Sequence, residues 1–235
     1  MRLHGLLGHP PGVRSSGGDL RDLDCPENST ENNIMNHTPI ERFHGYMAGV
    51  LDGSVVAGSQ VKSACERTKA LMADPDIYLD EDELTRLVPF MEQFVINDGH
   101  DTHGQNVTLM GWQVWVLGCV TALKWKEDDA PVLKENYQEV ARGAGKSAMA
   151  ALLAIYWAHT CPGIDVNVLS GKQDQAAIIL GSVKDFLEST GEHGLEWDST
   201  KYEVTIGRSS IKANHHNNQH QQMMLQQTLI QQQCS

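Results

Sequence analysis

The chain has 235 residues and a formal net charge of −12, and hydrophobic residues make up 40% of it. This length fits one domain of ordinary size with tails, and the apolar content is sufficient for a core. The acidic balance argues against a surface that grips DNA or a membrane over its whole area, although a local basic patch stays possible. No stretch reaches the ~18 uninterrupted apolar residues of a membrane span, so we expect no membrane partner.

The first segment, 1–38, is rich in Gly, Pro, Ser, Asn and Asp and has almost no apolar periodicity. We expect a disordered leader, with Met35 as an alternative translation start. The five cysteines form no CxxC pair, which supports neither a disulfide framework nor a zinc site. A reducing cytoplasm is therefore the expected compartment.

Residues 39–135 predict a small helical region. A helix is expected over 62–72, closed by the Asp74-Pro75 breaker. The acidic run 80–83 favours the start of a second helix, whose apolar stripe continues to Val95 and which Pro89 should kink or shorten. Apolar residues at helical spacing predict a third helix over 111–125.

Residues 136–213 have a different texture. We expect a short strand at 136–141, a glycine-bearing turn at 142–147 and a buried helix at 148–159. A second strand at 166–169, a helix at 172–189 and a hairpin of 201–206 with 209–213 around Gly207 follow. This order predicts an α/β fold with a P-loop NTPase-type parallel sheet and flanking helices, incomplete on its C-terminal side.

The tail 214–235 contains no Asp, Glu, Lys or Arg and is dominated by Gln, His and Asn. Such a low-complexity tract cannot bury enough apolar area to offset its loss of chain entropy. We expect this tail to be non-native, for example the product of a frameshift or a truncation.

The turn carries a phosphate-binding pattern. A P-loop needs inward-facing amides, a helix N-terminus, a lysine for the β/γ-phosphates and a hydroxyl for Mg²⁺. Gly143 and Gly145 permit the tight loop, Lys146 is the candidate phosphate clamp, and Ser147 is the candidate magnesium ligand. Val140 stands where the first glycine of the common motif belongs. The alternative is an incidental glycine-rich turn.

With these residues the chain resembles the large terminase subunit of tailed phages, from about 39 to 213. The segments that carry the resemblance are 45–58, 64–67, 109–113, 125–126, 139–147 and 170–176. Large terminases typically lack the first P-loop glycine and place an arginine inside the loop. In this sequence Val140 stands in place of that glycine, and Arg142 is the arginine inside the loop.

The resemblance implies roles for individual residues. Gln113 matches an adenine-reading glutamine, and Arg142 matches an arginine that stabilises the γ-phosphate. Together with Lys146, Arg142 would be catalytic, while 143–147 would hold ATP and Ser147 would hold Mg²⁺. The implied function is an ATPase that drives DNA into a viral capsid in the cytoplasm of a bacterial host. Double-stranded DNA, the portal and the small terminase subunit are the implied partners.

One expected feature is absent after Ser147. Hydrolysis requires a carboxylate at the end of an apolar strand, and none of the acidic residues from Asp165 to Glu203 follows a run of four apolar residues. We therefore expect weak ATP binding and poor or no hydrolysis. The alternative is a catalytically dead, nucleotide-binding prophage remnant or interaction fragment. A small-molecule kinase ranks lower, since only Arg208 follows Arg142 as a source of lid arginines.

Three further groups have competing interpretations. His100, Asp101 and His103 could ligate a metal, but a solvated loop is favoured because the segment sets no geometry. The His residues of the tail, at 215, 216 and 220, could bind metal adventitiously. Trp112 and Trp115 could stack on bases, although their helical spacing with Cys119 favours core packing.

Overall fold

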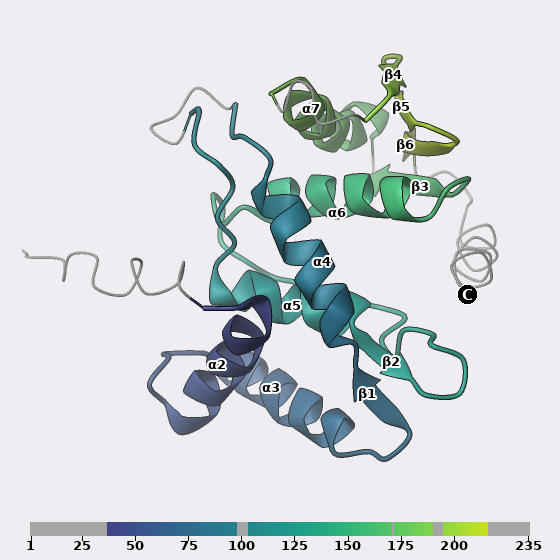
Figure 1. Cartoon of the computed structure of the whole chain (residues 1–235). Helices are drawn as coiled ribbons and strands as arrows, with labels where there is room; N and C mark the ends of the chain where they lie inside the picture. The colour runs from purple at the N-terminus through teal and green to yellow at the C-terminus, as the bar shows by residue number, and fades with distance from the viewer. Residues whose placement is uncertain (1–36, 98–102, 171, 190–194, 216–235) are drawn as a thin grey trace, which may run out of the picture.

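The computed structural model describes residues 37–97, 103–170, 172–189 and 195–215. This part is a mixed α/β structure with a helical region and an α/β region (Figure 1). The helices are α2 (Pro39–Asp52), α3 (Ser59–Met72), α4 (Glu81–Glu92), α5 (Gly111–Thr121), α6 (Lys146–Thr160) and α7 (Gln173–Ser189). The strands are β1 (Ile77–Leu79), β2 (Leu123–Trp125), β3 (Asp165–Ser170), β4 (Trp197–Ser199), β5 (Glu203–Ile206) and β6 (Ser209–His215).

Helix α2 begins the helical region, at a position where no helix was predicted. Its start is encoded locally: the Thr38 side chain accepts from the Glu41 amide and the Glu41 carboxylate accepts from the Thr38 amide, with Pro39 at the first helical position. Gly53 ends the helix in the left-handed conformation, with φ 86°. Phe43 of this helix is fully buried and packs on α5 at Gly118.

The predicted third helix, 111–125, is wrong at its end. Helix α5 stops at Thr121, and β2 pairs antiparallel with β1, placing Leu123 opposite Leu79. Three residues are too few to distinguish the periodicity of a helix from that of a strand, so pairing with β1 determines that β2 is a strand. The Asp80 amide donates to the Ala122 carbonyl at 2.7 Å, and this bond holds the end of α5 beside the start of α4.

Helix α4 confirms the predicted helix start. Asp80 is its N-cap and accepts from the Glu83 amide at 2.9 Å, so the acidic run serves the first helical turn. The helix passes through Pro89 and ends at Glu92, short of Val95, which matches the expected shortening.

The α/β region contains a four-stranded sheet in the order β3-β6-β5-β4. The predicted second strand and the hairpin around Gly207 are both present. Among the described strands only β3 and β6 pair in parallel, because β6 returns antiparallel to β5 and β5 to β4. The structure thus establishes a mixed α/β fold, and β3 lies at an edge of the sheet.

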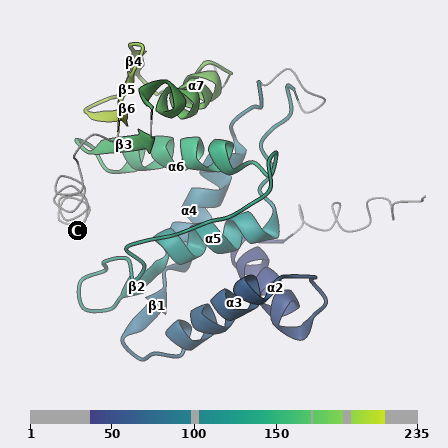
Figure 2. The same ribbon diagram turned by 180° about the vertical axis from the view of Figure 1, so that it is seen from behind.

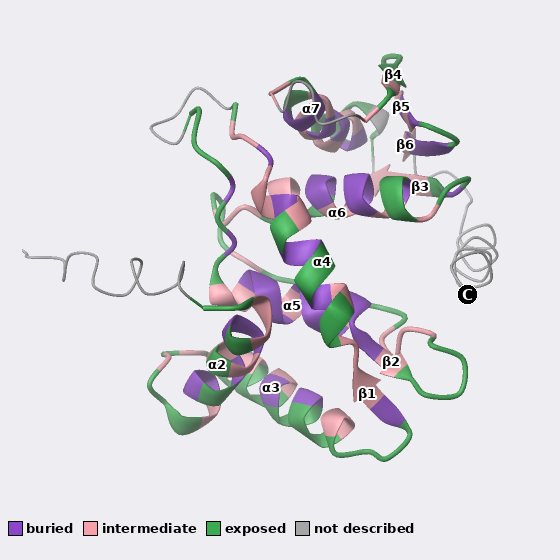
Figure 3. Cartoon of the chain, viewed as in Figure 1, coloured by how far each residue is buried: buried purple, intermediate pink, exposed green. Residues whose placement is uncertain are grey.

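Helices α6 and α7 pack on one face of this sheet. Ile211 and Ala213 of β6 are buried, and their parallel partners Val166 and Val168 lie beside them on the same face. The alternate residues of β6 are polar, and Lys212 contacts Asp165 on the other face at 2.9 Å. Figure 3 shows buried positions along α6 and α7, and also on α2, α4 and α5. Among the described residues, helices therefore cover one face of the sheet, and the side chains of β6 on the other face are polar.

The predicted strand at 136–141 does not form. These residues are extended but belong to no strand, and Tyr137 is 89% exposed. Asn136, Gln138 and Glu139 offer no apolar alternation that a sheet could bury, and β3 takes β6 as its parallel neighbour. The segment instead runs along α5 toward the start of α6 (Figure 2).

Helix α6 lies between the two regions, confirming the predicted buried helix at 148–159. One side packs on α4 through Tyr156, whose hydroxyl donates to Glu83 at 2.9 Å, and Phe90 stacks on His159. Its other side contacts α7 and the sheet. In the described part of the chain, no helix combines the length and apolarity needed to cross a membrane.

Candidate functional site

The glycine-bearing turn leads directly into α6, as the sequence predicts. Gly143 and Gly145 adopt φ values of 85° and 75°, in the region that favours glycine. The Ala144 amide donates to the Ala141 carbonyl at 3.3 Å, and the Met149 amide to the Gly145 carbonyl at 2.9 Å. The loop is therefore a compact turn and not an extended or helical stretch.

The start of α6 carries donors without a side-chain cap. Gly145 is the N-cap and makes no side-chain hydrogen bond to the first turn, so the amides of Lys146, Ser147 and Ala148 point out of the helix end. The helix dipole adds positive potential at this end. Buried Leu152 and Ile155 anchor the helix in the core, so this end is held in a fixed position.

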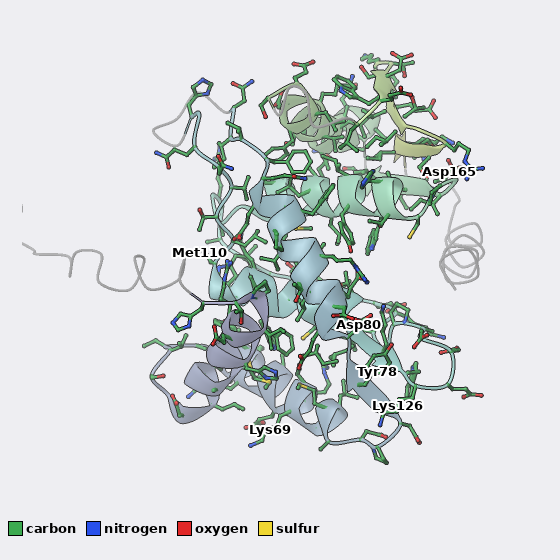
Figure 4. The ribbon with its side chains drawn as sticks, in the orientation of Figure 1. Lys69, Tyr78, Asp80, Met110, Lys126 and Asp165 are labelled. Carbon is green, nitrogen blue, oxygen red and sulfur yellow. The ribbon has the colours of Figure 1, made fainter. Side chains whose placement is uncertain are left out.

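Gln113 lies against the loop, although 30 residues separate it from Gly143. It is buried in the first turn of α5, and its Oε1 accepts from the Met110 amide at 2.8 Å (Met110 is labelled in Figure 4). Its Nε2 donates to the Ala144 carbonyl at 3.5 Å, and a Cβ on Gly145 would lie 3.0 Å from that nitrogen. The amide orientation is thus fixed, with the N–H₂ toward the loop and one oxygen lone pair already used.

A cavity of about 310 Å³ opens beside this contact. Gln113 and Gly145 line it together with apolar side chains from three parts of the chain, including Leu109, Leu152 and Phe186. Ser182 and Asp185 of α7 add a hydroxyl and a carboxylate. The volume lies at the small end of the range typical of ligand pockets.

Lys146 does not line this cavity. It is exposed, and it lines a separate cavity of about 210 Å³ with Val116, Asn136 and Gln138. Arg142 is exposed, and Ser147 is half-buried at the start of α6. The structure therefore brings together Gln113 and the loop backbone, and it leaves the two cationic side chains at the surface.

Carboxylates near the loop are few. Strand β3 ends at Ser170 and β6 at His215, so neither described strand ends in an acidic residue. Across 37–97, 103–170, 172–189 and 195–215, no three His, Cys, Asp or Glu residues gather in a way that could hold a metal. The proposed magnesium ligand Ser147 thus stays a sequence prediction.

The remaining candidates are the predicted metal ligands and the two tryptophans. His100 and Asp101 lie outside the described residues, as do His216 and His220, so the structure does not test those metal interpretations. Trp115 is buried against Tyr46, with ring centroids 5.6 Å apart, which fits core packing. Trp112 is only half-buried.

Sequence reasoning missed Ser182, Asp185 and Phe186 as neighbours of Gln113. Their spacing marks one face of a helix, but nothing in the sequence indicates that this face turns toward α5.

No family model matches the chain, and no curated protein or solved structure matches it. The resemblance to large terminases therefore stays a prediction from the sequence motifs.

Proposed function

We propose that this chain binds ATP at the start of α6 and that it is the ATP-binding part of a DNA-packaging motor of the large terminase class. The observation that carries the proposal is the contact between Gln113 and the loop. The sequence resemblance pairs these two elements as base reader and phosphate loop, and the fold sets the Gln113 amide 3.0 Å from the position of a Cβ on Gly145.

The phosphate groups would meet the N-terminus of α6. The amides of its first turn, aided by the helix dipole, supply donors that need no side chain. Lys146 and Arg142 are exposed and long, so each can swing toward a γ-phosphate beside the loop. For Lys146 this requires leaving the cavity that it shares with Asn136 and Gln138.

The base would lie in the 310 Å³ cavity beside Gln113. Its apolar walls suit a flat ring, and the second N–H of Gln113 can donate to a ring nitrogen. One lone pair of Oε1 remains to accept from an exocyclic amine, since the Met110 amide occupies the other.

The finer fold assignment belongs to the same proposal. A P-loop NTPase-type sheet needs further parallel strands beside β3, and β3 has an open edge in the described sheet. Mg²⁺, when bound with ATP, would neutralise phosphate charge, and the Ser147 hydroxyl is its candidate protein ligand. Double-stranded DNA, the portal and the small terminase subunit are the proposed partners, in the cytoplasm of a bacterial host.

A second candidate function is nucleotide binding without turnover, as in a prophage remnant. The absence of an acidic residue at the ends of β3 and β6 favours it for this chain by itself. In both cases the binding site is the same, so the two differ only in hydrolysis.

Binding of a fluorescent ATP analogue tests the proposal. We expect saturable binding that Lys146→Ala weakens at least about tenfold, because a charge-assisted hydrogen bond to phosphate contributes about 1.5–3 kcal/mol and tenfold corresponds to about 1.4 kcal/mol. Lys69→Ala is the matched control, since Lys69 is an exposed lysine at the end of α3 (Figure 4) and should leave binding unchanged. Equal binding by Lys146→Ala and wild type would overturn the assignment.

A steady-state ATPase assay separates the two candidates. We expect the purified chain to turn over ATP poorly or not at all. Robust turnover that depends on Lys146 would favour the complete motor activity and show that a carboxylate outside the strand ends of β3 and β6 serves the reaction.

A further inference from the structure

A second cavity, away from Gln113, borders the residues that lead into the glycine-bearing turn. It has a volume of about 690 Å³ and opens between α3, α5 and the extended segment 132–140. This volume falls within the range of small-molecule sites, and it is about twice that of the cavity beside Gln113. The proposed ATP site does not use it.

Aromatic and aliphatic side chains form the walls of this cavity. Tyr46, Trp112 and Trp115 contribute three rings, and Val61, Ala64 and Leu71 form the α3 side. Trp112 is half-buried, so part of its ring faces the opening instead of the core. The helical spacing of the two tryptophans therefore serves both purposes: Trp115 packs in the core, and Trp112 offers a ring to an occupant.

The polar groups at the cavity include three neutral amides. Gln60, Asn136 and Gln138 line it, and the Gln138 amide donates to Asn136 Oδ1 at 2.8 Å, which orients both side chains. An amide can donate and accept, so this set matches a polar edge that carries both kinds of group. Buried Thr68 and Cys119 bond to each other at 3.5 Å and do not call for a ligand group.

The charges at the cavity disfavour an anionic ligand. Arg67 is the cation among the described lining residues, and Glu135 and Glu139 oppose it. The chain as a whole carries a formal charge of −12, which repels polyanions such as nucleic acid. A molecule without net charge avoids both effects.

We propose that this cavity binds a neutral, flat heteroaromatic molecule of two or three fused rings. The ring system would stack on Trp112, and its polar edge would meet the amides of Gln60, Asn136 and Gln138. Tyr137 lies on the same wall and is 89% exposed, so a further ring is available to contact the occupant. The site is distinct from the cavity beside Gln113, since Gln113, Gly145 and Lys146 do not line it, but Asn136 and Gln138 also border the cavity that Lys146 lines.

Lumiflavin is a suitable probe, because it is neutral, tricyclic and fluorescent, and its edge carries carbonyl acceptors and an N–H donor. Stacking on tryptophan quenches its emission. We expect saturable quenching with a dissociation constant on the order of tens of micromolar, as ligand efficiency predicts for a molecule of this size.

Two variants and one control test the location in the full chain. Ala64→Phe fills the cavity and keeps both tryptophans, and Trp112→Ala removes the stacking wall; each should weaken binding at least about tenfold. Trp157→Ala is the control, because Trp157 lines a different cavity, between α4, α5 and α6, and should retain wild-type affinity. Circular dichroism checks that each variant is folded.

A measurement on the wild type covers the case in which a variant does not fold. In ¹H–¹⁵N spectra, lumiflavin should shift the indole signals of Trp112 and Trp115 and leave that of Trp157 in place. Absence of saturable quenching, equal affinity of all variants, or a shift confined to Trp157 would each overturn the proposal. Loss of ATP-analogue binding in Lys146→Ala bears only on the proposed ATP site.

Discussion

The helical region and the α/β region differ in how far they bury one of their ion pairs. In the helical region, Arg42 is 7% exposed, and its guanidinium contacts Glu92 at 2.9 Å and the Leu109 carbonyl. In the α/β region the comparable pair, Lys212 and Asp165, lies on the open face of the sheet, with side chains 35% and 51% exposed. The Arg42–Glu92 pair joins three segments of the helical region, and the Lys212–Asp165 pair of the α/β region is open to solvent.

This difference in exposure follows from the helices that surround each ion pair. Helices α2, α4 and α5 surround the Arg42–Glu92 pair, and the Leu109 amide also donates to Glu92 at 2.9 Å, so the pair is part of a network. The sheet has helices α6 and α7 on one face only among the described residues, so the Lys212 contacts with Asp165 and Glu203 on its other face stay open to solvent. We therefore expect the helical region to be more sensitive to loss of a single charged group.

Removing one cation from each pair should give the largest contrast. Arg42→Met leaves the partly buried Glu92 without its counter-ion and is expected to lower the free energy of unfolding by about 2–4 kcal/mol. Lys212→Met leaves the exposed carboxylates of Asp165 and Glu203 without this cation and should cost less than about 1 kcal/mol. Urea titration measures both. Equal losses would contradict the comparison between the two regions.

Glycines in α5 and α7 provide a contrast in packing. A Cβ on Gly118 would lie 2.6 Å from Phe43 Cδ2, whereas nothing lies within 4 Å of one on Gly181. Gly118→Ala is expected to destabilise the protein by about 1–2 kcal/mol, because overpacking outweighs the gain in helix propensity. Gly181→Ala should stabilise it by about 0.5–1 kcal/mol. Thermal unfolding of both variants measures these changes in stability. If Gly118→Ala stabilised the protein, Phe43 would have to move to make room for the added methyl group.

A smaller effect is expected from acidic pH. Burial raises the pKa of Asp80, but hydrogen bonds from the Lys124 ammonium and the Glu83 amide outweigh it and hold the pKa below its ordinary value. A lowered pKa contributes stability above the pKa of the unfolded state, and this stability is lost as pH falls through the folded-state value. Asp80→Asn keeps a capping side chain, so the loss near neutral pH should be about 1 kcal/mol and should shrink as the pH falls through the lowered pKa of Asp80.

Asp165 supplies the matched control for this titration. The Ser210 hydroxyl and the Lys212 ammonium lower its pKa, but its side chain is half exposed. Asp165→Asn should therefore change the pH dependence of unfolding less than Asp80→Asn does. The opposite ranking would show that the open face of the sheet is shielded from solvent.

The glycine-bearing turn was the part of the candidate site that the sequence described best. Gly143 and Gly145 before a run of small apolar residues predict a tight turn and a buried helix, and both are present because these preferences are local. Its neighbours were not predictable. The position of Gln113 depends on the packing of α5 beside α6, and the placement of Lys146 in a separate cavity depends on where segment 136–138 lies.

By itself the sequence determined the elements whose signals lie within a few residues: the acidic start of α4, the apolar stripe of α7, and the hairpin around Gly207. The tertiary structure alone decided which elements meet. Residues 123–125 are a strand because β1 pairs with them, and 136–141 are not, because β3 pairs with β6. Periodicity specifies which face of an element is apolar, but only packing specifies the surface that covers it.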